Sequence, residues 1–82
     1  MMRVNIRIFG PLRDIVKQNE LVLELPPPYT GEQAYETLAN KYPALRQWKP
    51  SVRLAVNLEY TGYDHELKPG DEVSLIPPVS GG

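Results

Sequence analysis

The stretch RVNIRIFGPLRDIVKQNELVLEL, residues 3–25, contains two runs in which apolar and polar side chains alternate. Alternation with a period of two is typical of a strand that buries one face. Gly10-Pro11 breaks the pattern between the runs and marks a turn. The stretch therefore predicts two strands that are joined by a loop and paired as an antiparallel hairpin. The residues expected to face inward are Val4, Ile6, Ile8, Leu21, Leu23 and Leu25.

A helix is predicted directly after this hairpin. The segment PPPY, residues 26–29, ends the second strand, because prolines cannot donate to a sheet ladder. Thr30 and Gln33 have the spacing of a capping box, which satisfies free amides of a first helical turn. Apolar residues then recur at helical spacing over 31–42. Pro43 ends the helix, because the residue before a proline avoids helical geometry.

The second half of the chain predicts two further strands and their connections. Residues 44–52 are expected to be irregular or to form one short turn, with leucine and tryptophan closing the edge of the core. Residues 53–60 predict a strand, and its run of leucine, alanine and valine indicates burial from both sides. The segment KPGD, residues 68–71, favours a type II turn. Residues 72–76 predict the last strand, with room for another short strand before it.

The order strand, strand, helix, strand, strand predicts an α+β fold. A helix that connects non-adjacent strands makes part of the sheet parallel, with a right-handed crossover. A mixed sheet with one main helix packed on one face is the β-grasp architecture of ubiquitin. An 82-residue chain can bury one modest core. We therefore expect a single domain over residues 1–78 and an extended C-terminal Gly-Gly tail over residues 79–82.

Composition excludes several classes of function. The chain has no cysteine, which rules out disulfides, thiolate zinc sites and a cysteine nucleophile, and its one histidine, His65, cannot form a metal site alone. A net charge of −1 argues against nucleic-acid binding. There is no apolar run of roughly 20 residues and no signal-peptide pattern, so a cytoplasmic protein without a membrane segment is expected.

Three short motifs have plain structural explanations that we favour. PPPY, residues 26–29, resembles a ligand for proline-binding grooves, but it also ends a strand. His65 could be a general base, yet it lies in a predicted turn without a nucleophile nearby. The pair Asp71-Glu72 is better explained by a turn followed by the outer face of a strand.

A docking surface is indicated by Phe9 and Ile76. Each is an apolar residue on the polar side of its strand, and the two strands are expected to lie close together. Exposed apolar residues that gather beside a free tail suggest an interface.

The C-terminal segment IPPVSGG has the features of a tail that enters a partner. Pro77-Pro78 fix the backbone and end the strand. Val79, Ser80, Gly81 and Gly82 then follow as a narrow thread, since glycine has no Cβ. A terminal carboxylate becomes an acyl donor only after activation, which requires a partner that holds ATP and magnesium. Ordering four residues costs about 4–8 kcal/mol, so a docking face must offset that cost. A frayed end is the plain alternative.

Residues 55–82, AVNLEYTGYDHELKPGDEVSLIPPVSGG, closely resemble the C-terminal third of a known family. The pattern DHxLxxGDEVxxxPPVSGG is characteristic of the small, sulfur-carrying subunits of molybdopterin synthase, which belong to the MoaD/ThiS family of ubiquitin-like proteins. The segment VNIRIFGPLRDIV, which includes Arg13, is similar to the first strand and following loop of that family.

The resemblance implies a β-grasp fold and a sulfur-transfer cycle. A ubiquitin-activating-like enzyme would use ATP and magnesium to adenylate Gly82, and a persulfide sulfur donor would convert it to a thiocarboxylate. The tail would then enter the large synthase subunit, which holds the active site, and donate sulfur to a cyclic pyranopterin precursor. Two small and two large subunits would form a heterotetramer. The resemblance places partner contacts at Phe9, Arg13, Tyr60 and Ile76, and it implies no cofactor on this chain.

Three alternatives remain open from the sequence. The same carrier chemistry could serve the synthesis of thiamine thiazole or of a tungsten pterin. The chain could instead be a protein modifier that is joined to lysines through Gly82, as ubiquitin is. It could also be a plain binding module whose tail has no role.

Overall fold

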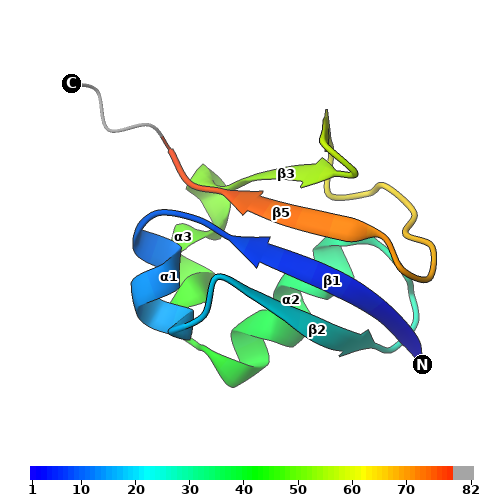
Figure 1. Ribbon diagram of the computed structural model, residues 1–82, viewed down its shortest axis with the longest axis horizontal. Helices are drawn as coiled ribbons and strands as arrows, with labels where there is room; N and C mark the ends of the chain where they lie inside the picture. Colours follow the sequence, from blue (N-terminus) through cyan, green and yellow to red (C-terminus); the bar gives the residue numbers. More distant parts are fainter. Residues whose placement is uncertain (79–82) are drawn as a thin grey trace.

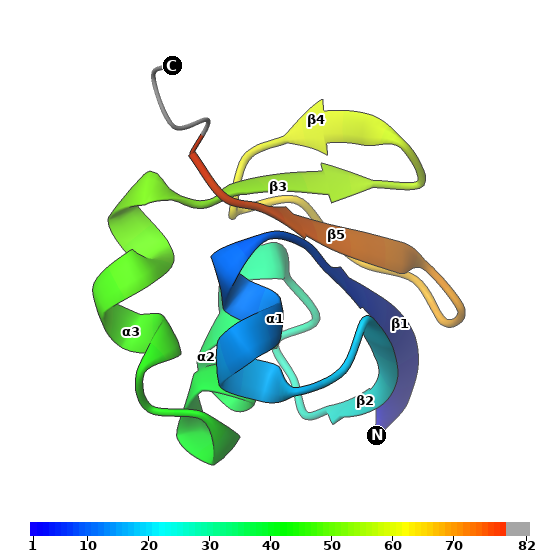
Figure 2. The ribbon, with the colours of Figure 1, turned by 60° about the vertical axis from the view of Figure 1, so that its left-hand side comes forward.

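Residues 1–78, the part of the chain that the computed structural model describes, form a five-stranded sheet with helices packed against one face (Figure 1). Figure 2 shows the helices together on one side of the sheet. The strands are β1 (Met2–Ile8), β2 (Glu20–Leu25), β3 (Arg53–Val56), β4 (Glu59–Thr61) and β5 (Glu72–Ile76). The helices are α1 (Pro11–Val16), α2 (Gly31–Lys41), α3 (Leu45–Trp48) and the 3₁₀ helix η1 (Lys49–Ser51).

The sheet has the strand order β2-β1-β5-β3-β4, so the first and last strands lie side by side within it. β1 and β2 pair antiparallel from Met2↔Leu25 to Arg7↔Glu20, which confirms the predicted hairpin. β1 and β5 pair parallel, and β3 pairs antiparallel with both β5 and β4. The sheet is therefore mixed, as a β-grasp requires.

The connection between β1 and β2 contains a helix where the sequence pattern predicted only a loop, and that prediction was wrong. Pro11 occupies the first turn of α1, where a missing amide hydrogen has no cost. Leu12 and Val16 lie one turn apart on the same side, and both are buried in the core. The helix ends at Lys17, which has a left-handed backbone with φ 68°. Burial of the Leu12–Val16 pair therefore holds this short helix against the sheet.

The predicted strand over residues 53–60 is divided by a tight turn. Asn57 and Leu58 both have positive φ, 51° and 71°, which is the backbone of a type I′ hairpin turn. The Asn57 side chain fixes the turn to the start of β5. Its Nδ2 donates to Asp71 Oδ1 at 3.0 Å, and its Oδ1 accepts from the Glu72 amide at 3.0 Å. The run thus forms the hairpin β3–β4, and β4 provides the additional short strand.

The bounds of α2 follow the sequence prediction, but only half of the predicted capping box forms, because the Thr30 amide donates to the Pro28 carbonyl at 3.0 Å. Thr30 Oγ1 accepts a hydrogen bond from the Gln33 amide at 3.2 Å, as an N-cap should. The helix ends at Lys41, two residues before Pro43. The chain then turns through α3, where Leu45 is buried, and Trp48 packs against the core from its edge.

One core fills the space between the inner face of the sheet and α2. Within it, Tyr35 Oη donates to the Leu45 carbonyl at 2.7 Å, which ties α2 to α3. Tyr63 meets the Tyr35 ring edge-on at 6.0 Å, and its hydroxyl donates to the Val52 carbonyl at 2.8 Å. These two hydroxyls therefore satisfy carbonyls in the segment between α2 and β3, which contains α3 and η1. The largest fully buried side chains include Ile6, Ile8, Leu12, Leu23, Leu25, Tyr35, Leu38, Leu45, Leu54 and Leu75.

We expect Tyr35→Phe to destabilise the fold. Removing the hydroxyl leaves the Leu45 carbonyl buried without its donor, which costs about 1–3 kcal/mol of the free energy of unfolding. The matched control is Tyr60→Phe, because the Tyr60 ring is exposed, and it should change that free energy by less than about 0.5 kcal/mol. Urea titration of both variants measures the difference, and equal effects would contradict this role of the Tyr35 hydroxyl.

Stability should also fall at alkaline pH. Burial, with a smaller contribution from Glu32, raises the pKa of Tyr63 from 10.0 to about 12, and burial raises the pKa of Tyr35 in the same direction. Unfolded tyrosines lose their protons first, so the free energy of unfolding declines as pH rises from about 10 towards 12. Urea titrations at pH 9, 10 and 11 test this decline. Tyr63→Phe should have a shallower decline, and an identical slope would show that the Tyr63 hydroxyl does not cause it.

Candidate functional site

Among residues 1–78, no helix covers the face of the sheet opposite α2 (Figure 2). Several apolar residues lie on this face. Residues that alternate along a strand share a face, so the pairing register shows which side chains are neighbours. Tyr60 pairs with Ala55, Ala55 pairs with Ser74, and Ile76 pairs with Arg53. We call this surface the open face. Ser74 lies on this face, as predicted, but its position in the central strand β5 leaves the residue only 5% exposed.

Phe9 extends this apolar group at the end of β1. Ile8 pairs with Leu75 in the parallel ladder, so the next residue along each strand, Phe9 and Ile76, lie beside one another. The Phe9 side chain is 37% exposed and the Tyr60 side chain 61% exposed, while Ile76 is half-buried. The fold therefore places three of the four predicted contact residues on one surface.

Two arginines border the open face and stack on its aromatic rings. The Arg53 guanidinium carbon lies 4.2 Å from the centroid of the Tyr60 ring, and that of Arg7 lies 5.8 Å from the centroid of the Phe9 ring. Such cation–π contacts hold an exposed ring in place. The sequence pattern alone did not single out Arg53, although its alternation with Ala55 places it on the same face.

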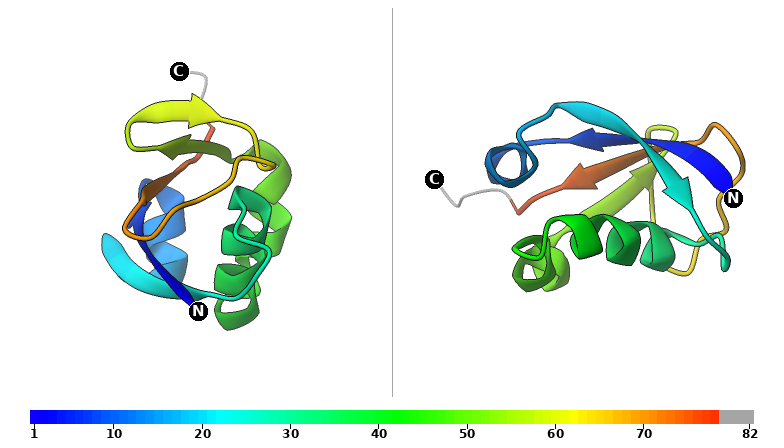
Figure 3. Two further views of the ribbon diagram at one scale, coloured as in Figure 1. Left: turned by 90° about the vertical axis from the view of Figure 1, so that its right-hand side faces the viewer. Right: turned by 90° about the horizontal axis from the view of Figure 1, so that it is seen from below.

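The last described residues leave the sheet next to the end of β1. A Cβ atom added to Gly10 would lie 3.0 Å from Pro77 Cγ, and Gly10 has φ +57°. Glycine at this position thus lets Pro77 pass close to the backbone. β1 and β5 both run toward this end of the molecule, where α1 also lies (Figure 3). The predicted tail residues Val79, Ser80, Gly81 and Gly82 lie outside the described residues.

Arg13, the fourth predicted contact residue, lies away from the open face. It is on α1, where its Nη1 donates to Asn19 Oδ1 at 3.3 Å. It borders a shallow hollow whose other lining residues are Asp14, Lys17, Gln18 and Asn19. A partner that contacts both the open face and Arg13 would have to reach around the end of the molecule where β5 ends.

The weaker motifs have structural roles. The His65 carbonyl accepts from the Gly31 amide at 3.1 Å, which attaches the loop after β4 to the start of α2. Asp71 Oδ2 accepts from the Lys68 amide at 2.8 Å and closes the predicted turn, whose Gly70 has φ +83°.

Within residues 1–78, acidic and histidine side chains form no group of three or more that could hold a metal ion. None of the helices formed by these residues is long and apolar enough to cross a membrane.

Comparison with known proteins identifies one family, on which the sequence profile and the curated relatives agree. The sequence profile of the ThiS family matches residues 6–82. A relative from Chlamydomonas reinhardtii, named molybdopterin synthase sulfur carrier subunit, is 35% identical and covers 99% of this chain and 100% of its own. A relative of the same name from Caenorhabditis briggsae is 34% identical and covers 100% of both chains.

Solved structures agree with this result. A putative molybdopterin converting factor, subunit 1, from Pyrococcus furiosus superposes with a TM-score of 0.85 at 26% identity, over 96% of this chain and 100% of that chain. The small archaeal modifier protein 1 from Methanosarcina acetivorans has a TM-score of 0.83 at 28% identity, over 100% and 98%. A complex of subunits 1 and 2 of the molybdopterin-converting factor from Helicobacter pylori has a TM-score of 0.68 at 27% identity, over 99% and 100%. The fold is the ubiquitin-like β-grasp that the sequence predicted, and the chain belongs to the ThiS family.

Proposed function

We propose that this chain is the sulfur carrier subunit of a molybdopterin synthase, with Gly82 as the residue that carries the sulfur. The observation that carries the proposal is the family match through residue 82, together with curated relatives of that name along the whole chain. The open face supports it, because a tail that must enter a partner needs a docking surface next to its origin, and Phe9 and Ile76 lie at that point.

The chemistry takes place on the terminal carboxylate and uses groups that partners supply. In an activating enzyme of the ubiquitin-activating type, the Gly82 carboxylate attacks the α-phosphorus of magnesium-bound ATP, and pyrophosphate leaves. The terminal sulfur of a persulfide donor then displaces AMP and forms an acyl disulfide. A second thiol cleaves the S–S bond and becomes part of a disulfide, which releases the thiocarboxylate. This chain provides the acyl group and its presentation.

The large synthase subunit is the proposed acceptor of the loaded tail, and the Helicobacter pylori structure is a complex of two such subunits of a converting factor. Ordering the four tail residues costs about 4–8 kcal/mol. Burying one fully exposed large apolar side chain contributes about 1.5–3 kcal/mol. Phe9 is 37% exposed and Ile76 is half-buried, so these two residues and Tyr60 offset part of the cost of ordering the tail. Sulfur would pass to a cyclic pyranopterin precursor within the large subunit, in a heterotetramer of two carriers and two large subunits.

A second candidate function is protein modification. The small archaeal modifier protein 1 from Methanosarcina acetivorans is as similar to this chain as the converting-factor structures are. Both functions share the acyl adenylate and differ in the nucleophile, which is a lysine amine in the modifier and sulfur in the carrier. A carrier that supplies sulfur for thiamine or for a tungsten pterin would use the same loading steps and would differ only in the final acceptor of the sulfur.

Incubation with the activating enzyme, ATP, magnesium and a persulfide donor should change the mass of the chain by the exchange of one oxygen for sulfur. Intact-protein mass spectrometry measures this exchange. The chain that lacks Gly82 is the control, and it should show none while keeping the same circular dichroism spectrum. An unchanged mass of the intact chain, under conditions that load another carrier, would sink the proposal. Lysine-linked conjugates in its place would favour the modifier function.

Truncation of the open face should weaken binding to the large subunit without loss of stability. Phe9→Ala and Tyr60→Ala each remove an exposed aromatic ring, and each should weaken binding at least about tenfold if the ring is buried by the partner. Leu58→Ala is the matched control, because Leu58 is 82% exposed and lies in the turn between β3 and β4. Isothermal titration calorimetry measures the three affinities. Equal affinities for all three variants would place the interface elsewhere.

A further inference from the structure

β2 forms one edge of the sheet, and the length of that edge is unpaired within residues 1–78 (Figure 1). Its ladder with β1 runs through six consecutive residue pairs without a bulge, so the pairing is regular throughout. In an antiparallel pair every second residue directs its N–H and C=O groups away from the partner strand. β2 contains no proline and no lysine that would block this edge. Its outer side therefore offers a regular row of donors and acceptors to another strand.

The side chains beside this edge are acidic at two positions and apolar between them. Glu20, Val22 and Glu24 alternate along β2 and point to the open side of the sheet, and Val22 is 58% exposed. Leu23 and Leu25, on the opposite side, are buried in the core. A strand added to this edge would thus meet acidic, apolar and acidic side chains in turn.

The strand that already pairs with β2 shows which side chains fit this pattern. β1 places Arg3 opposite Glu24 and Arg7 opposite Glu20, with Asn5 opposite Val22. Arg3 forms an ion pair with Glu24 at 3.4 Å. Basic residues four positions apart, with an uncharged residue midway, therefore complement β2 on its paired side. The same spacing would complement it on the free side.

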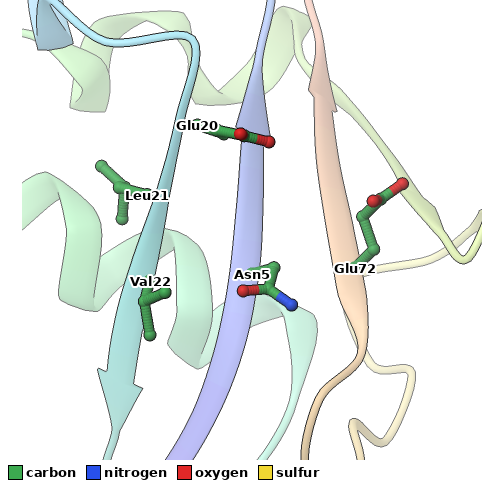
Figure 4. A pocket seen from close by; sticks show the side chains of 5 residues that line it. All are labelled: Asn5, Glu20, Leu21, Val22 and Glu72. Atoms are coloured by element: carbon green, nitrogen blue, oxygen red, sulfur yellow. The ribbon is translucent and has the colours of Figure 1, made fainter.

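Glu20 is the acidic residue of β2 whose charge is not balanced by an ion pair within residues 1–78. Arg7 forms its ion pair with Glu72, at 3.7 Å, and within residues 1–78 no cationic group lies within 4 Å of the Glu20 carboxylate. Figure 4 shows Glu20 and Val22 on β2, Asn5 on β1 and Glu72 on β5 around a shallow hollow. Its lining consists of two carboxylates, two apolar residues and an asparagine, and it includes no basic residue. A lysine or arginine of an added strand could lay its stem on Val22 and its charge beside Glu20.

A second copy of this chain fits the edge poorly in the register that is centred on Val22. Two β2 strands related by a two-fold axis through Val22 would pair antiparallel, and each Glu20 would then lie opposite a Glu24. Like charges directly opposite one another destabilise a strand pair. The two glutamates thus oppose this centred pairing of two copies, and they favour a basic partner strand.

We propose that the free edge of β2 is a second docking site, separate from the open-face apolar group, which binds an extended protein segment with basic side chains on both sides of an apolar one. Binding is by strand addition, with backbone hydrogen bonds to β2 and the basic side chains beside Glu20 and Glu24. Arg3 already pairs with Glu24, and Lys41 lines the same hollow, so Glu20 contributes the larger share of the charge selectivity.

A synthetic peptide with the core Lys-Thr-Val-Thr-Lys tests the site, because it reads the same in either strand direction. Added to the full chain, it should slow hydrogen exchange at alternate amides of residues 20–25, as measured by NMR. Val22→Lys should weaken binding at least about fivefold, because it removes the apolar pair at the centre of the edge and adds a charge of the same sign as the peptide. Leu58→Lys is the matched control, since it adds the same charge at an exposed leucine in the turn after β3, and it should bind as the parent chain does.

Charge exchange tests the selectivity. Glu20→Gln should weaken binding about two- to fivefold, the range of one cross-strand charge pair. Glu20→Lys should abolish binding of the lysine peptide, and it should bind the corresponding Glu-Thr-Val-Thr-Glu peptide instead. The proposal is overturned if β2 amides exchange at the same rate with and without peptide. It is also overturned if the protection of the β2 amides rises with protein concentration alone, which would indicate pairing with a second copy. It is overturned as well if the peptide slows hydrogen exchange at Tyr60 and Ile76 instead. Neither peptide experiment depends on Gly82 or on an activating enzyme.

Discussion

The parallel pairing of β1 with β5 is the constraint on which the rest of this structure depends. It joins the two ends of the domain within the sheet, and it brings the inner residues of both strands into one core. The same register places Phe9 beside Ile76 and Gly10 against Pro77. The apolar surface and the point where the chain leaves the sheet are therefore set by one ladder, so a partner that binds the surface also has the origin of the tail within reach.

The sheet provides two kinds of contact that make different demands on a partner. The open face is apolar with arginines stacked on its rings, so it suits a partner surface that excludes water. The β2 edge is polar and linear, so it suits an extended segment. The apolar group lies on β3, β4, β5 and the end of β1, whereas the β2 edge lies at the opposite side of the strand order. The hollows beside Glu20 and beside Arg13 are shallow, and each is lined by five residues.

Most of the fold could be predicted from the sequence, because the strands bury one face and therefore alternate. α2 was equally clear, since Thr30 caps it and Pro43 follows it. α1 was missed because a six-residue helix leaves only the Leu12–Val16 pair as a signal, beside a Gly-Pro that indicates a turn. The turn at Asn57 and Leu58 was missed because a leucine rarely adopts positive φ, and only the asparagine hinted at it. On the candidate site, the placement of Phe9, Tyr60 and Ile76 followed from register and resemblance, whereas the stacking of Arg53 on Tyr60 depends on a cross-strand neighbour that a single strand does not reveal.

The central position of β5 also has a mechanical consequence. β5 is hydrogen-bonded along both sides, to β1 and to β3, and it ends at Ile76 just before the proline pair. A force that pulls on the chain beyond Pro78 acts along the axis of β5 and loads both ladders in shear, so that many hydrogen bonds resist together instead of opening one at a time. Such an arrangement resists forced unfolding through a slow rate of strand detachment. A pull along the axis of β5 therefore meets more resistance than one that peels this strand away from its neighbours.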